Sequence, residues 1–98
     1  MKLLTEIEIK SMLSKLYWDV KVNPEQLYEL LNGDLDRIGH IDISNLYYRI
    51  LTTFDWYTIL KIVPRERLGE LLSDPVLDRI RFKDLKDKFL YAREKILQ

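Results

Sequence analysis

The 98-residue chain contains no cysteine and a single histidine, His40, and these scarcities exclude several kinds of chemistry. Without cysteine there is no disulfide, no thiolate nucleophile and no zinc site built on thiolates. One imidazole is a poor basis for a transition-metal site, and no nucleophile elbow accompanies it to indicate a Ser-His-Asp unit. Phosphate-binding glycine loops are absent too. We therefore expect a non-catalytic protein without metal or other cofactor, in which His40 lies at the surface.

Glycine and proline are also few, with three residues of each, and long apolar runs are missing. No stretch approaches the roughly 18 apolar residues that a membrane span needs. The N-terminal MKLLTEIEIK becomes acidic too early for a signal peptide. Hydrophobic residues at 47% and charged residues at 33% are typical of a folded chain. We expect one ordered domain, residues 1–98, that is cytoplasmic and does not bind a membrane.

The net charge is zero, but the charges are unevenly distributed. Residues 1–47 carry five basic and eight acidic residues, whereas residues 48–98 carry eleven and eight, so the two parts have net charges of −3 and +3. Such a dipole can steer a charged partner. It is weaker than the clearly basic balance of a typical nucleic-acid-binding domain.

Helix-capping signals are the clearest pattern in the first part of the chain. Thr5 and Glu8 have the spacing of a capping box, and apolar residues follow at helical spacing. Asn23-Pro24 combines an N-cap with a first-turn proline at the start of PEQLYELLNG, and Gly33 ends that segment. These signals predict two helices, followed by a connector over residues 33–43.

The same signals continue through the middle of the chain. Ser44 is predicted to cap NLYYRIL, and Asp55 is predicted to cap WYTILKIV, so a helical stretch over residues 44–63 breaks or bends near residues 52–53. Pro64 suits the first turn of a further helix in PRERLGELL, because proline is tolerated there and would kink a continuing helix.

The C-terminal part completes the fold prediction. Ser73-Asp74-Pro75 predicts a short helix through Ile80. The last segment carries an amphipathic stripe with the spacing 3-4-3-4, formed by Phe82, Leu85, Phe89, Ala92 and Ile96. The sequence thus predicts an all-α fold: a compact single-domain bundle of six or seven short helices, without strands.

The segment around WYTILKIV is apolar on nearly every side, which is typical of a helix in the middle of a protein. We therefore expect Trp56 and Tyr57 to be mainly core residues, with one ring lining a partner site as the alternative. The arginines nearby are expected at the solvent rim of this core: Arg49, Arg65 and Arg67.

The connector contains an EF-hand-like spacing over residues 34–45. Acidic side chains and a glycine occupy loop positions one, three, six and nine: Asp34, Asp36, Gly39 and Asp42. Ile38 stands where an oxygen ligand is needed, and Asn45 replaces the bidentate glutamate. A polar loop that joins two helices is the favoured interpretation, and a degenerate calcium loop is the least favoured functional alternative.

Basic residues gather near the C-terminus, and six of them are the candidate partner-binding residues: Arg79, Arg81, Lys83, Lys86, Lys88 and Arg93. A solvated helix face, with Lys83–Asp87 and Asp84–Lys88 paired at i,i+4, accounts for them without a function. As a functional site they favour a protein partner or a homo-oligomer. The alternative is a small nucleic-acid-binding regulator that uses the basic C-terminal helix, with affinity that falls steeply as salt rises.

Two stretches, LYWDVKVNPEQL and LYYRILTTFDWYTILKIVPRERLGELL, carry a family resemblance. They are similar to short, uncharacterised bacterial helical proteins with a Trp-Asp, an Arg-aliphatic-Leu and an acidic-Trp element. The matching positions are Tyr17, Trp18, Asp19, Arg49, Ile50, Leu51, Asp55 and Trp56. This chain has a longer segment between the first two elements and a more charged C-terminal helix.

That family is often encoded beside abortive-infection-type nucleotidyltransferase toxins. The resemblance therefore implies a small antitoxin-like or complex-forming partner protein, and it brings no catalytic residue to this sequence. It agrees with the interpretation of the residues themselves, which is a non-catalytic helical module for protein–protein interaction.

Overall fold

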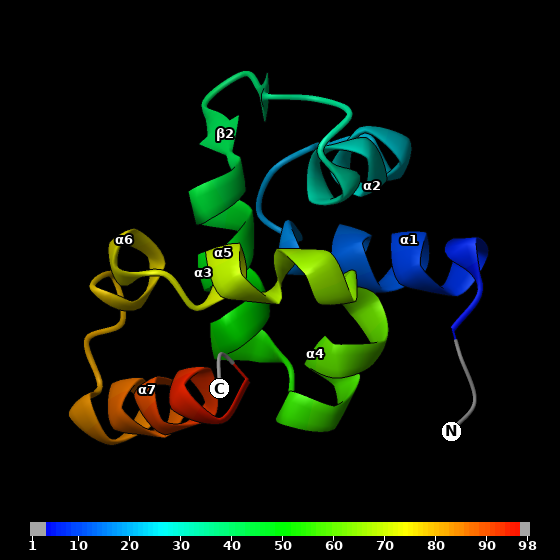
Figure 1. The fold of residues 1–98 in the computed structure, drawn as a ribbon. Helices are drawn as coiled ribbons and strands as arrows, with labels where there is room; N and C mark the ends of the chain where they lie inside the picture. The colour runs from blue at the N-terminus through cyan, green and yellow to red at the C-terminus, as the bar shows by residue number, and fades with distance from the viewer. Residues whose placement is uncertain (1–3, 97–98) are drawn as a thin grey trace.

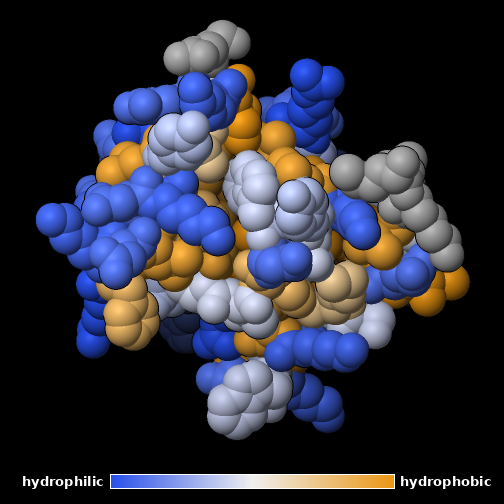
Figure 2. Space-filling view, turned by 90° about the horizontal axis from the view of Figure 1, so that it is seen from below, coloured by the Kyte–Doolittle hydropathy of each residue, from blue (hydrophilic) through white to orange (hydrophobic). Residues whose placement is uncertain are grey.

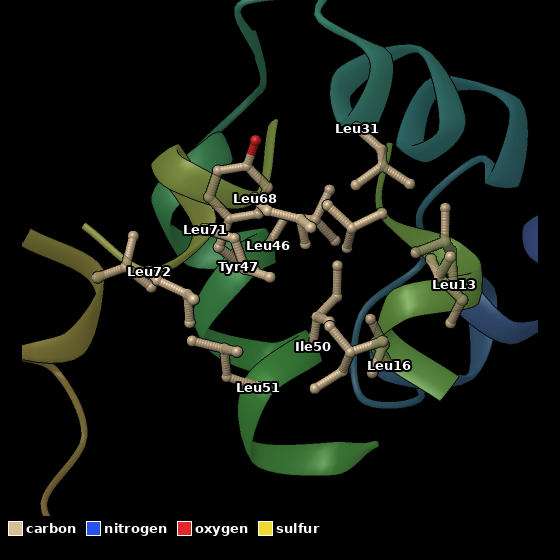
Figure 3. Close-up of a cluster of buried hydrophobic side chains, with 14 of the residues drawn as sticks. Leu13, Leu16, Leu31, Leu46, Tyr47, Ile50, Leu51, Leu68, Leu71 and Leu72 are labelled. Atoms are coloured by element: carbon tan, nitrogen blue, oxygen red, sulfur yellow. The ribbon is translucent and has the colours of Figure 1, made fainter. Parts of the chain in front are cut away.

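Helix α3, Ile43–Thr53, is the central element of the computed structural model, which describes residues 4–96 (Figure 1). Four of its residues are buried at helical spacing: Leu46, Tyr47, Ile50 and Leu51. Figure 3 shows these side chains between two groups of leucines, namely Leu13, Leu16 and Leu31 on one side and Leu68, Leu71 and Leu72 on the other. Because α3 presents apolar side chains to both groups, it joins the N-terminal and C-terminal helices into one core.

Helices α1, Glu6–Leu16, and α2, Pro24–Asn32, pack against each other on one side of α3 (Figure 1). The capping box is confirmed, since the Thr5 hydroxyl accepts from the backbone N–H of Glu8 and the Glu8 carboxylate accepts from the backbone N–H of Thr5. Asn23 caps α2 as predicted. Gly33 ends α2 with a φ of 87°, the left-handed conformation that glycine adopts at low cost.

The connector forms a small antiparallel hairpin, so the prediction of no strands is wrong. Strands β1, Arg37–Ile38, and β2, Ile41–Asp42, pair with Ile38 opposite Ile41. Gly39, with a φ of 58°, is the first of the two loop residues, where a tight hairpin turn needs a positive φ. Strands of two residues are too short to show the alternation that reveals a strand in sequence.

The hairpin also corrects the predicted start of α3. Asp42, the last residue of β2, is the N-cap, and its carboxylate accepts from the backbone N–H of Asn45 at 2.8 Å. Ser44 lies inside the helix. Both residue types are good N-caps, and the strand pairing of Asp42 fixes the chain direction so that the helix begins at Ile43.

The predicted break between residues 44 and 63 is confirmed. Helix α3 ends at Thr53, and Asp55 caps α4, Trp56–Ile62, by accepting from the backbone N–H of Thr58. Beyond Pro64 the chain forms a 3₁₀ turn, η1 (Arg65–Arg67), that continues into α5, Leu68–Leu71. Helix α6, Asp74–Leu77, stops before Ile80 and is thus shorter than predicted.

The long C-terminal helix α7, Lys83–Ile96, packs beside α6 and α4 at the lower edge of Figure 1. Of its predicted stripe Phe89 is buried, while three residues are half-buried: Leu85, Ala92 and Ile96. Phe82 precedes the helix and is 75% exposed, so its predicted place in the stripe is wrong. The all-α class is confirmed, with seven α-helices within residues 4–96. None of the helices in this range is long and apolar enough to cross a membrane.

Candidate partner-binding site

An apolar groove runs between α4 and the C-terminal half of α7. Trp56 of α4 forms one wall, and its ring lies 6.3 Å from that of Phe89, centroid to centroid, at a tilt of 51°. The groove has a volume of about 270 Å³, and the remaining lining residues come from α7: Lys88, Phe89, Tyr91, Ala92, Lys95 and Ile96. The lining that comes from residues 4–96 is therefore aromatic and aliphatic apart from two lysines.

The two lysines lie on the same side of α7, since they are seven residues apart and seven residues make two helical turns. No acidic side chain within residues 4–96 forms an ion pair with Lys88 or Lys95. The Lys95 ammonium lies 5.4 Å from the centre of the Tyr91 ring, and Tyr91 is 62% exposed. The groove thus combines an exposed aromatic ring with two lysines that form no ion pair within residues 4–96.

The other side of α7 holds the helix to its neighbours. Lys86 pairs with Asp78 at 2.9 Å, and Arg93 pairs with Asp74 at 2.6 Å while also donating to the backbone carbonyl of Leu72. The hydrogen bond from Arg93 lowers the pKa of Asp74. Lys86 and Arg93, both predicted to bind a partner, are therefore engaged within the chain.

The four other predicted partner-binding residues differ in whether they line the groove. Arg79, Arg81 and Lys83 are exposed in and just after the segment that joins α6 to α7, and within residues 4–96 they form no ion pair. The predicted pairs Lys83–Asp87 and Asp84–Lys88 are likewise not formed in this range. Only Lys88 of the six lines the groove. Tyr91 and Lys95 also line the groove and were not among the predicted partner-binding residues, although the spacing of residues 88, 91 and 95 indicates one helix face.

The aromatic pair at the start of α4 differs from its prediction. Tyr57 is 70% exposed, and Trp56 is half-buried in the groove wall. Because α4 has only two turns, it buries one face, Ile59 and Ile62, and leaves Tyr57 on the opposite side. The core prediction is therefore wrong for Tyr57, whereas Trp56 packs against the core and also lines the groove.

Arg49 is the centre of a polar cluster outside the groove. Its side chain is half-buried, so its predicted place at the solvent rim is wrong. Its Nη1 donates to the carbonyl of Leu16 at 2.6 Å and to Asp19 at 3.1 Å, and its guanidinium lies 4.2 Å from the centre of the Tyr17 ring. The Tyr17 hydroxyl donates to Asn45 Oδ1 at 2.7 Å. Burial raises the pKa of Tyr17 to about 12, and the bond from Arg49 lowers the pKa of Asp19.

This arrangement brings together three positions that carry the family resemblance, Tyr17, Asp19 and Arg49. The other matching positions are divided among the core (Ile50 and Leu51), the α4 cap (Asp55), the groove (Trp56) and the solvent (Trp18, 86% exposed).

The EF-hand-like segment is occupied by the hairpin. Its Asp42 carboxylate caps α3, and residues 4–96 contain no group of three or more His, Asp or Glu side chains that could hold a metal ion. His40 is exposed in the hairpin loop, as predicted. We therefore do not propose a calcium site in this segment.

No family model, curated protein or solved structure matches this sequence.

Proposed function

We propose that the protein is a non-catalytic interaction module that binds a partner protein at the α4–α7 groove. The observation that carries the proposal is the combination of an apolar groove with two lysines that have no acidic partner within residues 4–96. The family resemblance implies an antitoxin-like or complex-forming role, and we propose that the protein acts in the cytoplasm.

The occupant that fits the groove is an acidic amphipathic helix of the partner. Lys88 and Lys95 are separated by about 10.5 Å along α7, given a rise of about 1.5 Å per residue. Two carboxylates seven residues apart on an antiparallel or parallel helix would meet both ammonium groups. An apolar side chain between them would then pack on Trp56 and Tyr91, because helix-in-groove recognition uses anchors at this spacing.

The exposed surface around the groove provides the rest of the contact. Viewed from below, this face of the molecule shows pale and orange side chains with blue, hydrophilic ones among and around them (Figure 2). Tyrosine, tryptophan and arginine are common at the centre of protein interfaces, and a charged rim mainly increases the association rate and the specificity. We therefore expect Tyr91 and Trp56 to contribute most of the affinity and the lysines to select an acidic partner.

The test is affinity capture from the source cell with the full chain and matched variants. The double variant Lys88→Glu/Lys95→Glu reverses the groove charge, whereas Lys83→Glu makes the same change on α7 outside the groove. A partner that is stoichiometric with the wild type and with Lys83→Glu, and is lost with the double variant, supports the proposal. Deletion mapping of that partner should then place the contact in an acidic helix.

Two results would contradict the proposal. A partner retained by the double variant would place the binding surface elsewhere. Self-association in light scattering that the double variant abolishes would mean that the groove holds a second copy of this chain.

A growth test then addresses the antitoxin role. If a captured protein arrests growth when expressed alone and growth returns on co-expression with this chain, the role is that of an antitoxin.

The second candidate function, nucleic-acid binding, rests on Arg79, Arg81 and Lys83, which are exposed and have no ion-pair partner within residues 4–96. It predicts captured nucleic acid that is released as salt rises, because each phosphate contact releases counterions. Charge reversal at Arg79 and Arg81 should abolish that binding, while the groove variant should retain it.

A further inference from the structure

A second hollow lies at the N-terminal end of α3. It has a volume of about 480 Å³ and is lined by the segment after α1, by the hairpin and by the start of α3. Four aliphatic side chains form much of its surface, namely Val20, Val22, Ile38 and Ile41. This volume is within the range of pockets that bind small organic molecules.

The polar groups that line this pocket are mainly hydrogen-bond donors. Lys21 and Arg49 are cationic side chains, and the His40 imidazole also lines the pocket. Asn45 Oδ1 already accepts from Tyr17, so its amide N–H₂ is the group left to donate, and it has no acceptor within residues 4–96. Arg49 uses one nitrogen for Leu16 and Asp19, and its Nε and Nη2 donate to no other atom in the described range.

The positive charges of the pocket are only partly matched, because Asp19 pairs with Arg49 while Lys21 forms no ion pair within residues 4–96. None of its lining residues, which all fall within residues 17–49, is acidic. Asp19 pairs with Arg49 from outside the lining, and Asp42 is engaged at the N-cap of α3. The absence of acidic residues from the lining is unusual for this part of the chain, because residues 1–47 have a net charge of −3. The local excess of donors is thus a property of the pocket and not of the region.

We propose that this pocket binds an organic anion with an apolar body, such as a carboxylate that carries an aliphatic side chain. The carboxylate is held by Lys21, Arg49 and the Asn45 amide, and the aliphatic part packs against the valines and isoleucines. A free small molecule and the C-terminal residue of a peptide share this chemistry. The proposal does not depend on the α4–α7 groove.

The test uses N-acetyl-leucine as the probe and follows the imidazole signals of His40, the single histidine, by NMR. We expect saturable shifts with a dissociation constant on the order of millimolar, the range open to a ligand of about a dozen atoms. N-acetyl-leucine amide lacks the charge and inorganic phosphate lacks the apolar body, so both should bind at least about tenfold more weakly. A peptide ending in leucine that binds tighter than N-acetyl-leucine would identify the source as a protein C-terminus, and equal affinity would indicate a small molecule.

Variants at exposed positions keep the test independent of folding. Lys21→Gln should weaken N-acetyl-leucine binding about two- to fivefold, and Val20→Glu should weaken it more, because it places an acid at a half-exposed site in the lining. Lys15→Gln, an equal change on exposed α1 surface, should leave it unaltered. Three results would overturn the proposal. N-acetyl-leucine could fail to bind at a concentration about 20-fold above the expected dissociation constant, or its amide or phosphate could bind equally well. The third result is that neither Lys21→Gln nor Val20→Glu changes the binding of N-acetyl-leucine.

Discussion

Two tyrosine–arginine clusters at the core differ in the hydrogen bonds that their polar atoms form. In the first, the Tyr47 hydroxyl accepts from Arg67 Nε at 3.1 Å and donates to Glu70 at 3.3 Å, while Arg67 Nη2 donates to Glu70 at 3.0 Å. The three side chains form a closed triangle. In the second, Tyr17 and Arg49 bond to separate acceptors and are joined to each other by stacking.

The difference shows how the same residue types can serve structure or leave room for binding. The closed cluster uses the hydroxyl of a side chain that is only 1% exposed, and it joins α3 to η1 and α5. The open cluster leaves Arg49 nitrogens and the Asn45 amide beside a pocket. Paired polar groups stabilise a core, whereas unused donors beside a hollow are available to a ligand.

The largest expected effect comes from breaking the closed cluster. Tyr47→Ala should reduce the free energy of unfolding by about 3–5 kcal/mol, because it leaves a cavity beside α3 and removes the hydroxyl between Arg67 and Glu70. Urea denaturation measures this effect. Tyr57→Ala, at a 70% exposed position, is the matched control and should stay within about 0.5 kcal/mol of the wild type. A similar loss in both variants would contradict the assigned burial.

Breaking the open cluster should cost less. Arg49→Met keeps much of the aliphatic stem but leaves the Leu16 carbonyl at the end of α1 without its donor, so we expect a loss of about 2–3 kcal/mol. The comparison is with Arg65→Met, an exposed arginine for which we expect a change within about 0.5 kcal/mol. If thermal denaturation gives the two variants the same midpoint, the Leu16 bond contributes nothing to stability.

The smallest expected effect is a loss of folding stability at alkaline pH. It tests the open cluster, because it depends on the ionisation of Tyr17. The folded-state pKa of about 12 lies above the ordinary value of 10.0, so between these values the unfolded chain loses the proton and the folded chain keeps it. Stability from this group is complete below pH 10 and falls as the pH rises toward 12. We expect a loss of roughly 1–2 kcal/mol between pH 9 and pH 11.

Tyr17→Phe isolates that contribution from Tyr47, whose pKa is also raised by burial. Urea denaturation at both pH values should show a smaller loss for Tyr17→Phe than for the wild type. Equal losses would show that Tyr17 ionises as readily in the folded protein as in the unfolded chain.

Local signals in the sequence were enough to predict most helix boundaries. Thr5 with Glu8, Asn23-Pro24, Gly33 and Asp55 each act within one helical turn, so their roles depend little on the rest of the fold. The choice of Asp42 over Ser44 as a cap could not be predicted, because it depends on the pairing of β2 with β1.

The candidate site was only partly predictable for a similar reason. The sequence indicates a basic C-terminal helix, but the packing of α6 on α7 decides that Lys86 and Arg93 meet Asp78 and Asp74. The groove itself requires Trp56 to meet Phe89 across 33 positions of sequence. No local pattern encodes either contact, so which cations are left for a partner follows only from the tertiary structure.

The contrasting positions of the two tryptophans give the protein a built-in optical reporter. Trp18 is 86% exposed, so its emission is that of an indole in water in both the folded and the unfolded chain. Trp56 lies in the groove wall against Phe89, so a segment that docks there removes water from its ring and shifts its emission to shorter wavelength. In a Trp18→Phe variant the remaining tryptophan fluorescence comes from the groove alone, and occupancy can be titrated without a label.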